Sequence, residues 1–93
     1  MSLVARVGTA FEVNLEEPVG TGYRWLPDAL PIGLSLIDEE RRQAGQTGAG
    51  GGALHVFRLE AAAVGEYAVH FALKRAWVTV PARVEVINVR VQS

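Results

Sequence analysis

Few side chains in this sequence can act as nucleophiles, general bases or metal ligands. Cysteine is absent, the histidines are His55 and His70, and the serines are Ser2, Ser35 and Ser93. No serine lies in the Gly-x-Ser-x-Gly turn that is typical of hydrolases. The histidines fall on different predicted strands without a suitably spaced carboxylate, so we expect His55 to be partly buried, His70 to face solvent and neither to bind a metal. The chain is therefore predicted not to be an enzyme and to need no metal or cofactor.

The charge and hydropathy of the sequence also give no indication of binding to nucleic acid or to a membrane. Nine Lys and Arg against ten Asp and Glu give a net charge of −1, without the basic excess that phosphate backbones attract. No apolar run approaches the roughly 18 residues of a membrane helix. Residues 48–53 have the letters of a dinucleotide fingerprint, but that motif follows a strand and opens a helix, whereas here a strand follows. We expect no nucleic acid, membrane or dinucleotide to bind.

Three glycine-rich or aromatic stretches could instead recognise a protein. They are residues 17–22, which contain Thr21, residues 45–52, which contain five glycines, and residues 74–81, which contain Trp77. The glycines either form a simple flexible hairpin or let the backbone approach a partner closely. Trp77 either folds back onto the core or is held out for a partner, since tryptophan is common in both places.

The elements that carry these stretches read as β-strands throughout. Apolar residues alternate with polar ones at Phe11, Val13 and Leu15, and no window sustains helical spacing. The same alternation runs through 54–60 and 66–73. The segment 82–91 changes phase after Val86, which predicts a bulge or a strand covered on both faces. Strands are expected near 3–7, 10–16, 23–26, within 33–44, and at 53–60, 66–73 and 82–91.

These strands predict an all-β fold, an immunoglobulin-like antiparallel β-sandwich of about seven strands in a single domain over residues 1–93. Tyr23 and Trp25 are expected mainly in the core, and the charge run from Asp38 to Arg42 on the solvated surface. In a chain of alternating strand directions, every second connection lies at the same end. The three unusual stretches therefore belong at one end of the sandwich, where loops on a rigid scaffold commonly bind partners.

The residues of these three connections resemble the chagasin family of cysteine-peptidase inhibitors. The Thr-Gly-Tyr-x-Trp of the family's first motif is present at 21–25, although Glu17 replaces an Asn and the loop has one extra residue. The Gly-x-Gly-Gly motif matches residues 48–51, before the strand that contains Phe57. The Arg-Pro-Trp motif corresponds to residues 75–77, with Ala76 in place of proline. The resemblance extends over nearly the whole chain.

The resemblance implies reversible, tight-binding inhibition of papain-like cysteine peptidases, with the three loops covering the active-site cleft. Thr21 would lie nearest the catalytic pair, Gly22 would permit the turn, and Trp77 would be the aromatic anchor. Gly50 and Gly51 would bring main-chain groups to the cleft wall, and Arg75 would either contact the peptidase or brace its loop. The peptidase-binding residues implied are Val19, Gly20, Thr21, Gly22, Gly48, Gly50, Gly51, Arg75, Ala76 and Trp77.

Two other hypotheses remain open at this stage. The sandwich could be a non-inhibitory binding or adhesion module that docks a protein or glycan through the same loops, or a structural domain of a larger secreted protein. We expect a monomer whose partner is a papain-like cysteine peptidase. The compartment is left open: periplasmic or secreted if a leader precedes these residues in the gene, and otherwise cytoplasmic.

Overall fold

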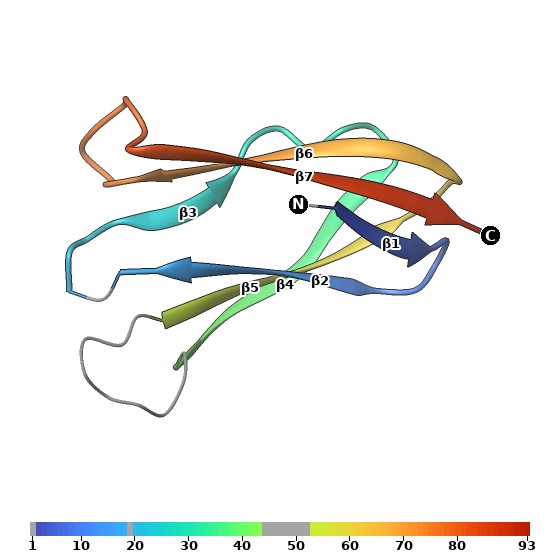
Figure 1. Ribbon diagram of the computed structural model, residues 1–93, viewed down its shortest axis with the longest axis horizontal. Coiled ribbons are helices and arrows are strands. Elements are labelled where there is room, and N and C mark those ends of the chain that lie inside the picture. The colour runs from blue at the N-terminus through green and yellow to red at the C-terminus, as the bar shows by residue number, and fades with distance from the viewer. Residues whose placement is uncertain (1, 19, 44–52) are drawn as a thin grey trace.

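The computed structural model describes residues 2–18, 20–43 and 53–93, which form two facing β-sheets (Figure 1). One sheet has the strand order β1-β7-β6-β3 and the other has the order β2-β5-β4. The strands in these ranges are β1 Ser2–Arg6, β2 Phe11–Glu17, β3 Arg24–Pro27, β4 Leu34–Gln43, β5 Ala53–Ala61, β6 Gly65–Lys74 and β7 Arg83–Gln92. The predicted all-β sandwich is confirmed, and each expected strand is present within a residue or two of its predicted bounds.

One pairing differs from the predicted antiparallel pattern. β1 runs parallel to β7, with Ser2 opposite Asn88 and Arg6 opposite Gln92. The other pairs, β2 with β5, β4 with β5, β3 with β6 and β6 with β7, are antiparallel. Strands whose directions alternate along the chain are parallel when an odd-numbered strand pairs with another odd-numbered one, as the first and seventh do here. The parallel pair therefore agrees with the alternation on which the loop prediction depends.

The core lies between the sheets and contains the inward-facing residues of every strand except β4's charged half. Trp25 is 2% exposed, and Phe57 and Phe71 are fully buried with ring centroids 4.9 Å apart. The burial of Trp25 confirms its predicted place in the core, whereas Tyr23 is half-buried. Burying each large aromatic side chain favours folding by about 1.5–3 kcal/mol.

The change of phase in β7 has a simpler cause than either predicted alternative. The register between β6 and β7 is continuous, so β7 has no bulge. Ile87, Val89 and Val91 face the core, while Val84 and Val86 lie on the outer face and are 54% and 38% exposed. The bulge predicted for 82–91 and the cover on both faces are therefore both wrong. The register shift that does occur is in β4, between Leu36 and Asp38.

The charge run in β4 is divided between the two sides of its strand. All of Asp38 to Arg42 is exposed, as predicted. On the outer face, Arg58 of β5 lies 3.0 Å from Asp38, and Arg42 donates from Nε to Glu40 at 2.6 Å. The hydrogen bond and charge of Glu40 raise the pKa of the Arg42 guanidinium. The alternate residues of the run, at positions 39 and 41, pair instead with buried side chains of β5 and β2.

The strand registers show that the connections 18–23 and 75–82 lie at one end of the sandwich. Arg24 at the start of β3 is opposite Lys74 at the end of β6, and Leu73 is opposite Arg83 at the start of β7. In the other sheet, Glu17 and Gln43 at the ends of β2 and β4 are both opposite Ala53 at the start of β5. We call this the loop end, residues 18–23 the threonine loop and residues 75–82 the tryptophan loop; both loops are on the left in Figure 1.

The opposite end of the sandwich, which we call the tyrosine end, is closed by Tyr67 near the start of β6. Its hydroxyl donates to the carbonyl oxygen of Ala63 at 2.8 Å. This is the tyrosine corner of immunoglobulin-like sandwiches, in which a tyrosine at the start of the sixth strand bonds back to the preceding turn. Within the described ranges, no helix has the length and hydrophobicity needed to span a membrane.

Candidate functional site

The threonine loop is held in shape by its own threonine. The backbone N–H of Tyr23 donates to Oγ1 of Thr21 at 3.3 Å, and that hydroxyl lies 3.5 Å from the carbonyl oxygen of Pro18. Gly20 and Gly22 have φ of 77° and 82°, which residues other than glycine rarely adopt. Thr21 and both glycines are exposed. The described residues of the loop thus form a compact turn that presents its backbone and the small side chain of Thr21 to solvent.

The tryptophan loop presents the largest exposed aromatic group among the described residues. It begins with a tight turn, in which the N–H of Val78 donates to the carbonyl oxygen of Arg75 at 3.1 Å. It closes where the N–H of Ala82 donates to the carbonyl oxygen of Leu73 at 2.8 Å. Trp77 is 72% exposed and Val80 is 73% exposed. Of the two alternatives left open by the sequence, the indole is therefore held out from the core.

The two loops contact each other through the indole. A Cβ placed on Gly22 would lie only 3.3 Å from Cη2 of Trp77, so the tip of the ring rests against this glycine. The guanidinium carbon of Arg75 lies 4.4 Å from the centroid of the Tyr23 ring and 5.8 Å from that of the Trp77 ring. Such cation–π contacts are worth about 0.5–1 kcal/mol at exposed sites. Arg75 therefore joins the two loops at the loop end. Its predicted contact with a peptidase stays a prediction.

The base of the threonine loop is formed by a buried carboxylate. Glu17, the last residue of β2, is 1% exposed, and its Oε2 accepts a hydrogen bond from the backbone N–H of Trp25 at 2.7 Å. The same oxygen lies 2.7 Å from Nδ1 of His55. A second bond joins the same two strands, because the indole Nε1 of Trp25 donates to the carbonyl oxygen of Glu16 at 2.7 Å. The two strands that the loop connects are therefore joined directly beneath it.

The prediction that no carboxylate is suitably placed for either histidine is wrong for His55. Its two ring nitrogens lie 2.7 Å from Glu17 and 2.8 Å from Oε1 of Glu39, and the residue is 4% exposed. His70 is exposed on the outer face, as expected. Among the residues that the structure describes, no group of three or more His, Asp or Glu side chains is arranged to hold a metal ion.

Glu17 and His55 are the residues that the sequence-based prediction missed, and period two could have found both. Glu17 has the same parity as the inward-facing Val13 and Leu15, and His55 has the same parity as Phe57 and Leu59. The prediction placed Glu17 in a loop instead of extending the alternation of β2 to it. Their contact could not be predicted from period two alone, because it depends on the register of β2 against β5, in which Leu15 lies opposite His55.

Positive charge gathers on the outer side of the loop end. Arg24 and Lys74 lie directly opposite each other on neighbouring strands, and Arg75 follows in the chain. None of the three forms an ion pair with a residue in the ranges 2–18, 20–43 and 53–93. Facing cations are mildly unfavourable. The three residues place positive charges where β3 begins and where the tryptophan loop follows β6.

The predicted site residues fall into two groups. Gly20, Thr21, Gly22, Arg75 and Trp77 are brought together as described, and Ala76 is exposed in the same loop. The predicted residues Val19, Gly48, Gly50 and Gly51 lie outside the described residues. The strands that flank residues 44–52, β4 and β5, end and begin at the loop end.

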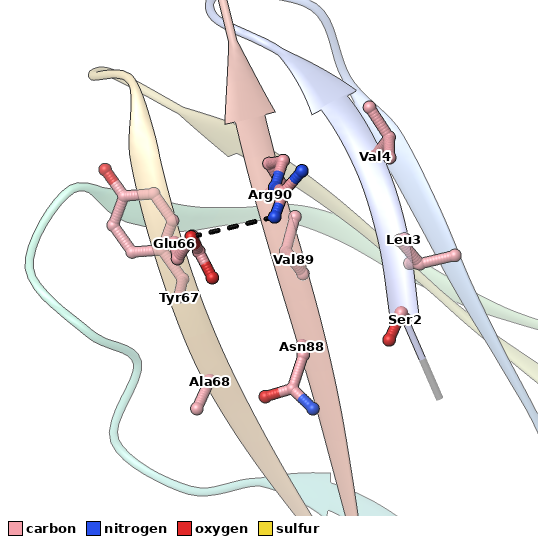
Figure 2. A pocket seen from close by; sticks show the side chains of 9 residues that line it. All are labelled: Ser2, Leu3, Val4, Glu66, Tyr67, Ala68, Asn88, Val89 and Arg90. Atoms are coloured by element: carbon pink, nitrogen blue, oxygen red, sulfur yellow. Dashed lines mark ion pairs between the residues drawn. The ribbon is translucent and has the colours of Figure 1, made fainter.

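A hollow of about 440 Å³ lies elsewhere, across β1, β7 and β6 (Figure 2). The ion pair drawn there joins Arg90 to Glu66 over 3.9 Å. Glu66, which lies opposite Arg90, is the second residue of β6, whereas Lys74 at the loop end is the last residue of the same strand. The hollow therefore belongs to the tyrosine end and contributes nothing to the two loops.

Comparisons with known proteins find one matching family model and several similar solved structures. The model of the chagasin family of peptidase inhibitors matches residues 4–91. The cysteine protease inhibitor EhICP2 from Entamoeba histolytica has a similar structure, with a TM-score of 0.78 and 19% identity over 98% of this chain and 86% of its own. The solution structure of amebosin is similar with a TM-score of 0.71 and 25% identity over 98% of this chain and 88% of its own. No match was found among curated protein sequences.

Proposed function

Because the chain belongs to the chagasin family of peptidase inhibitors, we propose that it inhibits papain-like cysteine peptidases by laying its loop end across their active-site cleft. The observation that carries the proposal is the joint exposure of Thr21 and Trp77 on two loops in contact, with the indole against Gly22. Side chains on such a ridge can enter a groove without any change in the sandwich. A family of inhibitors also agrees with a chain that is not itself an enzyme.

In this proposal the threonine loop covers the catalytic cysteine and histidine of the peptidase. Thr21 faces the narrow centre of the cleft, and the neighbouring residues 19, 20 and 22 bring main-chain groups close to it. The bonds of the Thr21 hydroxyl to its own loop support this role, because they hold the backbone in a closed turn. A backbone that stays in this turn does not present a scissile carbonyl to the thiolate in the geometry of attack. The loop therefore blocks the site without being cut.

The flanking parts supply binding area on either side of that centre. Trp77 is the aromatic anchor, since exposed tryptophan is the residue type most enriched among binding hot spots. Arg75 holds the anchor in place through its contacts with the Tyr23 and Trp77 rings. On the other side, residues 48, 50 and 51 are proposed to contribute main-chain groups to the cleft wall. In this proposal one copy of the chain supplies all three segments, and the inhibitor acts as a monomer; the contact needs no metal, nucleic acid or membrane.

The test is a titration of a papain-like enzyme with the purified protein. Inhibition predicts a stoichiometric loss of peptidase activity that is recovered on dilution, whereas a docking module that binds other proteins or glycans predicts no loss. Trp77→Ala should raise the inhibition constant at least about 30-fold, equivalent to about 2 kcal/mol. Thr21→Asp should raise it at least about tenfold, because a charge would be buried without a partner at the centre of the cleft.

A matched control is Val64→Ala, which truncates an exposed apolar side chain in the turn between β5 and β6, at the tyrosine end. It should leave the inhibition constant unchanged. Circular dichroism should show all three variants folded. Inhibition that is unchanged by both loop variants would show that another surface of the protein binds the peptidase.

A further inference from the structure

The buried carboxylate of Glu17 has a partner at each oxygen: Oε2 accepts a hydrogen bond from Trp25, and Oε1 forms an ion pair with Arg41 but accepts no hydrogen bond within the described residues. Its side chain has no exposed surface, and three nitrogen atoms surround it. They are the backbone nitrogen of Trp25 and Nδ1 of His55, both 2.7 Å from Oε2, and Nη2 of Arg41, 2.9 Å from Oε1. A buried charge is tolerated only when it is paired and hydrogen-bonded in this way. The carboxylate is thus the centre of a small polar cluster inside an otherwise apolar core.

His55 gives this cluster a second contact with β4, beside that of Arg41. Its ring stacks on Phe57 with centroids 4.2 Å apart, and its Nε2 lies 2.8 Å from Glu39 of β4. With carboxylate oxygens at both nitrogens, the ring donates to one in either neutral tautomer and to both when it is protonated. Stacking and hydrogen bonding together fix the ring plane, so the ring in turn fixes the direction of the Glu17 side chain.

The cluster joins the strand ends on which the loop end is built. Glu17 ends β2 and Trp25 lies at the start of β3, so their hydrogen bond closes the base of the threonine loop between the two sheets. Arg41 and Glu39 belong to β4, and His55 to β5. An apolar cluster could stabilise this region equally well, because replacing buried ion pairs with packed apolar groups is often neutral or stabilising. The hydrogen bonds and ion pairs also set the distances between the strands that they join, which apolar packing sets less strictly.

We propose that Glu17 and His55 are positioning residues for inhibition, which hold the base of the threonine loop at the spacing that presents Thr21 and Gly22 to the peptidase. This inference rests on the proposed function. Both residues are buried, so in this proposal neither touches the peptidase. Their effect on inhibition passes through the backbone N–H of Trp25 and the turn that precedes it.

The test compares Glu17→Gln, His55→Gln and the double variant, with Glu12→Gln as the matched control. Glu17→Gln keeps nearly the same shape, so the fold is expected to survive, but it removes the charge and replaces one acceptor oxygen with an NH2 donor that must face either Arg41 or the nitrogens at Oε2. Glu12 is a partly exposed carboxylate on the outer face of the same strand. Each single variant should raise the inhibition constant for a papain-like enzyme about tenfold, and the control should leave it unchanged. The double variant should also lose about tenfold, since both residues act through one contact.

Amide hydrogen exchange of the free protein separates positioning from a general loss of stability. In Glu17→Gln, exchange at the N–H groups of Tyr23 and Trp25 should increase about tenfold, while exchange at Val69 in the centre of β6 should not change. An equal increase at all three amides would overturn the proposal, as would an additive, about hundredfold loss in the double variant or unchanged inhibition in both single variants. If the wild-type protein inhibits no papain-like enzyme, the proposed function fails, and the exchange pattern alone decides whether the cluster holds the loop.

Discussion

Both ends of the sandwich place an aromatic ring against a glycine with positive φ, but they use the ring differently. At the tyrosine end, a Cβ on Gly33 would lie 3.0 Å from the hydroxyl of Tyr67, whose ring is half-buried and bonded to Ala63. At the loop end, Gly22 lies against Trp77, whose ring is 72% exposed. The first ring completes the fold, whereas the second is supported by the fold and left accessible to a partner.

The hydrogen bonds that close the two ends also differ, in how far apart along the chain their partners lie. Tyr67 closes its end through a local bond to a residue four positions earlier in the chain. The loop end is joined by Glu17 and His55, which are 38 positions apart and link the two strands β2 and β5. A local contact is sufficient at the tyrosine end, where the strands simply end and no loops have to be held together. Contacts between distant segments suit an end at which separate loops must keep fixed positions relative to one another.

The largest expected effect tests whether the buried carboxylate holds the loop end. Glu17→Ala should lower the free energy of unfolding by about 2–4 kcal/mol, because it leaves the buried N–H of Trp25 and Nδ1 of His55 without their partner. Urea denaturation followed by tryptophan fluorescence measures this change. Glu12→Ala, which removes an exposed carboxylate from the same strand, should cost less than about 1 kcal/mol. Equal losses in the two variants would mean that the burial of Glu17 is energetically unimportant.

A smaller effect compares the two glycines directly. Gly33→Ala and Gly22→Ala should each cost about 1–2 kcal/mol of stability, since both positions have the positive φ that a Cβ disfavours. Only Gly22→Ala should weaken inhibition, by about tenfold, because its Cβ also displaces the indole of Trp77. Thermal unfolding and titration of a papain-like enzyme measure the two quantities. Weakened inhibition by Gly33→Ala would show that the two ends are coupled and do not have separate roles.

The smallest expected effect belongs to the tyrosine corner. Tyr67→Phe removes one hydrogen bond and leaves the ring against Gly33, so the free energy of unfolding should fall by about 0.5–1.5 kcal/mol. The inhibition constant should stay the same, because the hydroxyl lies at the far end of the sandwich from Trp77. A change of more than about twofold in the inhibition constant would contradict the assignment of Tyr67 to folding alone.

Much of the architecture could be predicted from local patterns. Alternation identified the strands because a half-buried strand needs one apolar face, and Trp25 proved buried as expected. The direction of successive strands then predicted one common end for the threonine and tryptophan loops, which the strand registers confirm. The interpretation of β7 was wrong because local alternation does not say how much of an outer face is covered. Val84 and Val86 are simply apolar residues on an exposed face.

Residue types and their spacing along the chain were enough to predict the strand pattern, and the motifs at 21–25, 48–51 and 75–77 resemble those of the family to which the chain belongs. The exposure of Trp77, its brace by Arg75 and the meeting of Glu17 with His55 beneath the threonine loop emerge only in the folded molecule. Each of these facts depends on which strands pair and in what register. A contact between residues far apart in the chain leaves no periodic signal, because its geometry is fixed only when the two sheets close over their shared core.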